Sequence, residues 1–235
     1  MDFLKLLKSF EEFVYEALLW LILVPITLGR IVLQPRTMTA YAAKELALPD
    51  ERRFNFAVSP PLLLILCVVI AQAFDMGVRT QAEVSEESLA NLLLASEQNL
   101  LLYRTIAFGI WALVGAAYFL IRSGIPVSRD SLRVPFYEQC YLVSPFALAL
   151  SFSVSLSLTD RRGAIVGVAL VLVGTLWFWV VQADWMQQKA RMPLWRSLVA
   201  ATLILLIGAL ANTLVGQALS HARPTTSPSH VRGAH

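Results

Sequence analysis

Charged side chains are scarce in this chain, and its longest apolar stretches contain almost none of them. Only 15% of the 235 residues are Asp, Glu, Lys or Arg, whereas a soluble domain carries about 25%. Hydrophobic residues make up 57% of the chain, and the mean hydropathy is +0.64. The formal net charge of +3 is too small to indicate nucleic acid binding. The composition therefore predicts a membrane protein whose main partner is the lipid bilayer.

Residues that carry chemistry are also few. The two cysteines, Cys67 and Cys140, lie within or beside apolar runs, where a disulfide is not expected. The three histidines all follow the last apolar run: His221, His230 and His235. No HExxH, GxSxG, GxGxxG or P-loop pattern occurs, so zinc-protease, serine-hydrolase and nucleotide chemistry have no visible basis. We therefore expect no catalytic residue, no cofactor and no bound metal.

Five long apolar runs divide the chain. They cover residues 57–74, 105–121, 141–158, 163–183 and 198–219. Each has about the 17–25 residues that a helix needs to cross a hydrocarbon core about 30 Å thick. A lone strand cannot satisfy its backbone hydrogen bonds in lipid, so each run is expected to be a helix. The sequence predicts an all-α integral membrane protein with a five-helix transmembrane bundle over residues 57–220.

The first 56 residues are predicted to form amphipathic and interfacial helices before this bundle. Apolar side chains recur every three or four positions from Phe3 to Leu18, and lysines and glutamates fall mainly on the other face. The uncharged stretch at 17–29 is short for a span and contains Pro25. We expect it to dip into the membrane or to pack on the bundle; a sixth span over residues 13–33 is the competing interpretation. Residues 221–235 are predicted to be a disordered tail.

Basic residues favour every second connection between the apolar runs. With five spans, thirteen lysines and arginines fall on the side of the N-terminal segment and six on the other side. Basic residues prefer the cytoplasmic face of a membrane. We therefore predict a multi-pass protein of the bacterial inner membrane with a cytoplasmic N-terminus and an external C-terminus. Arg161 and Arg162, in one tight turn, run against this trend.

Small residues in the runs indicate close contacts between helices. Gly163 and Gly167 form a GxxxG pair, and the run at 141–158 repeats alanine and serine every four positions. Such serines can bond to their own helix or to a neighbour. We interpret these residues as packing sites; the alternative is a polar path between helices, lined by Ser151, Ser155, Gln182 and Asn212.

Ionisable residues are nearly absent from the central thirds of the runs, where they would be costly and usually functional. Asp75, Glu138 and Asp184 lie at the ends of runs, where we expect water to reach them. Asp184 stands among tryptophans, as in an interfacial aromatic belt, and is a candidate contact for a lipid headgroup or a substrate. A lipid-modifying enzyme that uses Asp184 or Glu138 is the weakest of the functions considered.

Several short motifs resemble those of the Yip1-like membrane proteins. The motifs are Pro-Arg-Thr-Met at 35–38 with Tyr41, Arg-Phe at 53–54, and Ser-Pro-Pro-Leu at 59–62, which opens the first run. The resemblance covers about 30 residues by motif and most of the chain by topology. The longer polar N-terminal domain of eukaryotic members is missing. The resemblance implies a cytoplasmic N-terminal part, about five spans and a non-enzymatic role, and it transfers no catalytic residue.

Two functions follow from these patterns. The first is a non-enzymatic inner-membrane scaffold, assembly factor or partner subunit, which associates with other membrane proteins or with itself. The second is a permease or transporter subunit with a polar path between its helices. The scarcity of charge inside the runs and the absence of catalytic motifs favour the first function, whereas the second would need a continuous polar path through the bundle.

Overall fold

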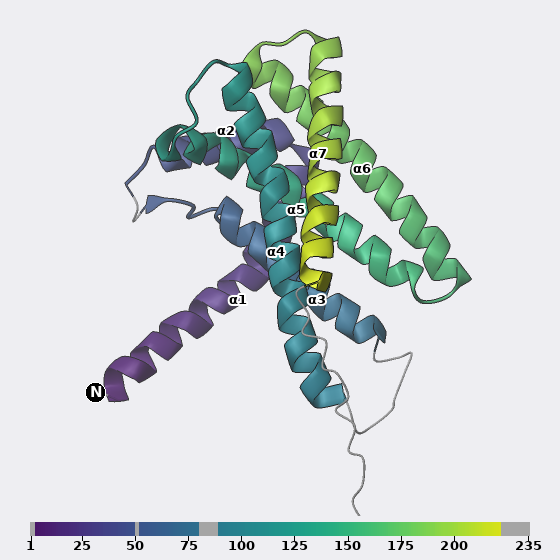
Figure 1. Ribbon diagram of the computed structural model, residues 1–235. Helices are drawn as coiled ribbons and strands as arrows, with labels where there is room; N and C mark the ends of the chain where they lie inside the picture. The colour runs from purple at the N-terminus through teal and green to yellow at the C-terminus, as the bar shows by residue number, and fades with distance from the viewer. Residues whose placement is uncertain (1–2, 50–51, 80–88, 222–235) are drawn as a thin grey trace, which may run out of the picture.

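The computed structural model describes residues 3–49, 52–79 and 89–221, and within them it contains helices and no strand (Figure 1). The helices are α1 (Phe3–Leu33), α2 (Pro35–Leu46), α3 (Pro60–Arg79), α4 (Leu89–Arg122), α5 (Arg129–Ser157), α6 (Arg161–Ala190) and α7 (Leu194–His221). The predicted all-α membrane fold is confirmed. The predicted tail, apart from His221, lies outside the described residues.

Six of these helices are long and apolar enough to cross a membrane, one more than the five predicted. The additional helix is α1, which continues through Pro25 without a break. Proline is tolerated within such helices because neighbouring groups can bond the backbone carbonyl that it leaves free. The helix α4 also begins at Leu89, well before the apolar run at 105–121.

The helix α5 lies at the centre of the bundle and packs against α1, α2, α3, α4 and α6 (Figure 1). A serine cap defines its start, because the Ser128 hydroxyl accepts a hydrogen bond from the Ser131 backbone N–H at 3.1 Å, and the Ser131 hydroxyl accepts one from the Ser128 N–H. Residues of α3, α4, α5, α6 and α7 form one apolar core. Residues of α1, α2 and α3 form a second core, which packs against Tyr141 of α5.

Glycines bring α5 and α6 close together, as the GxxxG pair predicts. A Cβ on Gly167 would lie 2.7 Å from the Ser153 carbonyl oxygen, which leaves room for hydrogen only. The Ser153 hydroxyl donates to the Gly167 carbonyl at 2.7 Å, so the contact also carries a hydrogen bond between helices. Other serines of α5 bond back to their own helix, such as Ser144 to the Cys140 carbonyl.

The two cysteines are buried and unpaired, as predicted. Cys140 belongs to the larger core, and Cys67 belongs to the core between α1, α2 and α3. Neither side chain is exposed to solvent. Both therefore act as small apolar core residues.

Candidate functional site

Two buried polar clusters lie at opposite ends of the bundle. We call the end with α2 and the α4–α5 and α6–α7 connections the basic face, and the end with the α5–α6 connection the opposite face. The basic face is marked by Arg122, Arg129, Arg133 and Lys189, among other cations. The apolar core separates the two clusters.

The glutamate cluster, formed by Glu138, Trp185 and Lys189, lies near the basic face. Glu138 is completely buried, its Oε1 lies 2.7 Å from the Lys189 ammonium, and its Oε2 accepts a hydrogen bond from the Trp185 indole at 2.9 Å. The prediction that water reaches Glu138 is wrong, because α5 is the central helix and α6 covers this side chain. A buried carboxylate needs such partners, since an unpaired buried charge is very costly.

An amide pair, Gln139 and Gln182, lies next to this cluster. Both side chains are fully buried, and their four polar atoms have no hydrogen-bond partner within the described residues. They meet above Gly115 of α4: a Cβ there would lie 2.6 Å from Gln139 Oε1 and 3.1 Å from Gln182 Nε2. Buried amides without partners are rare and usually mark a bound water or a functional contact.

The arginine cluster, formed by Gln72, Asp75, Arg104 and Ser155, lies near the opposite face. Arg104 donates to Gln72 Oε1 at 3.0 Å and to Asp75 Oδ2 at 3.2 Å. The Ser155 hydroxyl donates to Asp75 Oδ1 at 2.7 Å. Asp75 is 1% exposed, so the prediction that water reaches it is also wrong. The cluster joins α3, α4 and α5, and each of its charges faces an opposite charge or a dipole.

An aromatic layer separates the two clusters. It consists of Phe108, Trp111, Phe146 and Phe178, all buried, with neighbouring ring centroids 4.6–5.7 Å apart. Along α5, Phe146 comes between Gln139 and Ser155. Those two residues are sixteen positions apart, which corresponds to about 24 Å along a helix. The polar groups therefore do not form a continuous row in this structure.

Asp184 makes a third polar contact, between α6 and α2 near the basic face. Its carboxylate accepts two hydrogen bonds from the Arg36 guanidinium, one of them from Nε at 2.8 Å, and a third from the Gln188 amide. The Asp184 hydrogen bond and charge raise the pKa of Arg36. This bidentate geometry is typical of Arg–carboxylate recognition, and it joins α2 to α6 at the surface.

The structure distributes the predicted polar-path residues over several places. Ser155 belongs to the arginine cluster, and Ser151 lies beside it, with its carbonyl accepting from the Ser155 hydroxyl. Gln182 belongs to the amide pair. Asp184 binds Arg36, and Asn212 is half-buried on α7. The site thus consists of two separate clusters and a surface bridge.

Comparison with protein-family models, curated proteins and solved structures finds no match to this chain. The resemblance to the Yip1-like proteins therefore stays a prediction.

Sequence reasoning missed three contributors to these clusters: Arg104, Gln139 and Lys189. Arg104 directly precedes an apolar run, so in the sequence it resembles any basic residue of a connection between spans. Its burial follows from the position of Asp75 on α3, which no local pattern reveals. One available signal was the adjacent polar pair Glu138 and Gln139, which lies just before the apolar run at 141–158 and follows two aromatic residues.

Proposed function

We propose that this protein is a non-catalytic subunit or scaffold of a membrane complex, of the Yip1-like kind suggested by its motifs. The observation that carries the proposal is the exposure of the N-terminal half of α1. The first half of this helix leaves the bundle, and every residue from Lys8 to Glu16 is exposed (Figure 1). A long helix that packs on its own bundle by one end only offers the other end to a partner.

The uncovered part of α1 is amphipathic. Phe10, Phe13 and Val14 lie on one face at helical spacing and are 63%, 59% and 38% exposed. Farther along the same helix, Val24, Thr27 and Ile31 are buried against the bundle. The apolar stripe therefore extends beyond the part that the bundle covers.

The charges on α1 favour a protein over anionic lipid as the occupant of this stripe. Glu11, Glu12 and Glu16 lie on the polar face, and none of them has an ion-pair partner among the described side chains. Carboxylates are repelled by anionic headgroups and attracted to lysine or arginine. We propose that an apolar helix of another protein, with basic residues at its end, packs here.

The buried charges of the bundle support a structural role. Glu138 pairs with Lys189, and Asp75 pairs with Arg104. Each pair joins different helices, and breaking such a pair is strongly destabilising. These ion pairs therefore stabilise the packing of neighbouring helices, as a rigid scaffold requires.

Affinity purification of the tagged chain in mild detergent tests this proposal. The variant E11Q/E12Q/E16Q removes the acidic face of α1 and should lose a partner that wild type retains. The variant R161Q/R162Q, which changes exposed charges on another helix, is the matched control and should retain it. The proposal fails if wild type brings down no stoichiometric partner, or if both variants behave alike. A purified complex that contains only copies of this chain would indicate self-association instead.

We further propose the bacterial cytoplasmic membrane as the location, with the basic face toward the cytoplasm and the C-terminal end of α7 outside. The excess of lysine and arginine on the connections of the basic face supports this orientation. An interfacial α1 keeps the N-terminus cytoplasmic, as the sequence predicts. An α1 that crosses the membrane, for which Lys8–Leu33 has the length, places it outside.

A permease or transporter subunit is the second candidate, and the amide pair is the observation that favours it. Four unpartnered polar atoms in the bundle interior are suited to bind water or a small polar solute. The aromatic layer would then have to open during transport. Uptake into liposomes that is lost in Q139L/Q182L and retained in R161Q/R162Q would support this function; no uptake of any tested solute would contradict it.

A further inference from the structure

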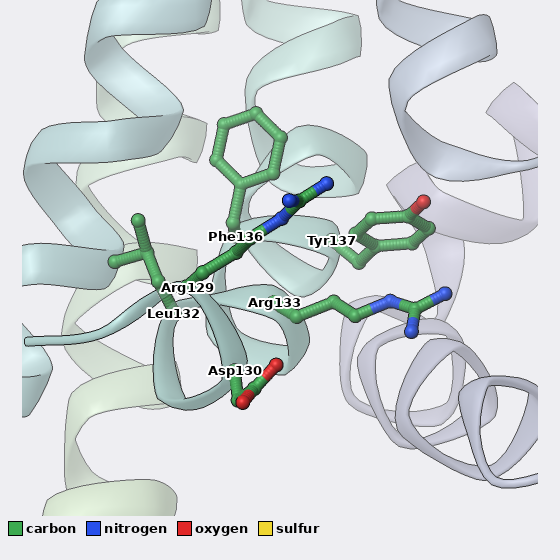
Figure 2. A pocket seen from close by; sticks show the side chains of 6 residues that line it. All are labelled: Arg129, Asp130, Leu132, Arg133, Phe136 and Tyr137. Atoms are coloured by element: carbon green, nitrogen blue, oxygen red, sulfur yellow. The ribbon is translucent and has the colours of Figure 1, made fainter.

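A hollow at the start of α5 lies on the basic face, outside the clusters described above. Its volume is about 470 Å³, and it is lined by Arg129, Asp130, Leu132, Arg133, Phe136 and Tyr137 (Figure 2). That volume falls within the usual range of small-ligand sites. The lining combines two cations with two aromatic rings.

The two arginines are free to bind a ligand. Arg129 and Arg133 are one helical turn apart, both are exposed, and neither forms an ion pair with a carboxylate of the described residues. Figure 2 shows both guanidinium groups on the side of α5 that carries Tyr137, whereas the Asp130 carboxylate points away from them. A pair of guanidiniums at this spacing can hold the oxygens of one phosphate group by several charge-assisted hydrogen bonds.

The site is held in position by its neighbours. Tyr137 stacks on Phe54 with ring centroids 6.2 Å apart and meets Phe136 edge-to-face at 6.4 Å. The Phe54 backbone N–H donates to Glu45 of α2 at 2.5 Å. The serine cap at Ser128 fixes the first turn of α5. The arginines therefore project from a rigid base, which lowers the cost of ordering them around a ligand.

We propose that this hollow, the headgroup site, binds the phosphate of an anionic phospholipid. The shared chemistry is a phosphate anion, and the surroundings select the lipid as its source. Leu132, Phe136 and Tyr137 give the hollow an apolar wall beside the arginines, at the start of a helix that has the length and hydropathy of a membrane span. Arginine beside tyrosine is the composition typical of a membrane interface. Anionic lipids are abundant on the cytoplasmic surface, to which the basic face is assigned.

Binding of phosphatidylglycerol to the full-length protein in detergent, followed by native mass spectrometry, tests this site. Wild type should bind phosphatidylglycerol in preference to phosphatidylcholine. The variant R129Q/R133Q should bind it about 20–30-fold more weakly, since each basic residue near a lipid surface contributes about 5-fold. R161Q/R162Q removes the same charge elsewhere and should bind as wild type does.

Two further outcomes make the test decisive. R129K/R133K keeps the charge but loses the fork geometry, so its affinity should lie between those of wild type and R129Q/R133Q. The proposal is overturned if R129K/R133K binds as wild type does, if R161Q/R162Q loses as much affinity as R129Q/R133Q, or if phosphatidylcholine binds equally. It is also overturned if inorganic phosphate displaces the lipid at equal concentration, which would indicate a site for soluble phosphate.

Discussion

At the scale of single residues, the bundle is held by a few buried polar groups whose partners lie on other helices. Glu138, Asp75 and Arg104 are each nine-tenths or more buried, and each has an oppositely charged partner. Removing one member leaves the other buried and unpaired, which costs more than removing both. This asymmetry gives a direct test of the arginine cluster.

We expect Arg104→Leu to lower the free energy of unfolding by about 3–5 kcal/mol, because it removes the guanidinium that pairs with the buried Asp75 carboxylate. The double variant D75L/R104M should recover most of that loss, since an apolar pair of similar size often replaces a buried ion pair at little cost. Thermal unfolding in one detergent measures both. Equal losses in the single and double variants would contradict the role of this pair.

A second residue-scale prediction concerns Gly115. A Cβ there would lie 2.6 Å from Gln139 Oε1 and 2.7 Å from Gln139 Cδ, so Gly115→Ala must displace the amide pair and should cost about 1–3 kcal/mol. Gly109→Ala, on the same helix with nothing within 4 Å of the new Cβ, is the matched control. It should be neutral or stabilising by up to about 1 kcal/mol, because alanine favours helix. Similar losses at both positions would argue against a tightly filled amide pair.

At the scale of elements, α2 is attached by contacts of two kinds. Met38 and Ala42 are buried in the smaller core, whereas the Arg36–Asp184 bridge is at the surface, with Arg36 69% exposed. Exposed ion pairs generally contribute little to stability, because water and dissolved ions compete for both charges. The apolar contacts should therefore hold α2 in place without the bridge.

Accordingly, Arg36→Ala should change the unfolding temperature far less than Arg104→Leu does. Solvent already competes for the Arg36 guanidinium, whereas Arg104 is buried. Both variants can be compared in the same detergent by the same thermal scan, with wild type as reference. A loss from Arg36→Ala as large as that from Arg104→Leu would mean that the bridge, rather than the core, fixes α2.

The elements also show how far the sequence predicts this structure. Hydrophobic runs of span length located α3 to α7 correctly, because length and hydropathy are local properties. The GxxxG pair predicts a close contact between helices, and the structure shows that the partner of α6 there is α5. In the sequence, Pro25 argues against one continuous α1, since proline usually disrupts the interior of a helix. Its buried stripe of Val24, Thr27 and Ile31 depends on α2, α3 and α5, which lie far away in the sequence.

The candidate site was predicted less well for the same physical reason. In the sequence, Asp75 and Glu138 lie near the ends of apolar runs, which predicts that water reaches them. Their burial depends on partners supplied by other helices, Arg104 for one and Lys189 with Trp185 for the other. Contacts between helices determine whether these side chains are buried. The pattern of residues within a single helix does not predict such contacts.

At the scale of the whole molecule, orientation in the membrane follows from the distribution of basic residues. The native cysteines are both buried, so single exposed cysteines can be introduced against a low background. Thr159→Cys, in the α5–α6 connection, should react with an impermeant thiol reagent added to intact cells. Ser123→Cys, at the basic face, should react only after the membrane is opened; the reverse pattern would invert the proposed topology.

The position of Ser9 then decides how α1 lies. Ser9→Cys should be protected in intact cells if α1 lies along the cytoplasmic surface, and it should react if α1 crosses the membrane as a sixth span. Ser9 is exposed in the structure, so burial within the protein does not complicate the comparison. The same labelling experiment provides both controls, Thr159→Cys and Ser123→Cys.

Photo-crosslinking in intact membranes is the decisive test of the proposal that the uncovered stripe of α1 binds a helix of another protein. A photoreactive residue at Phe13 lies on the stripe, and one at Leu172 of α6, which is 64% exposed, serves as the lipid-facing control. We expect a discrete adduct with a different protein from position 13 and only lipid adducts from position 172. Lipid adducts alone from both positions would contradict it.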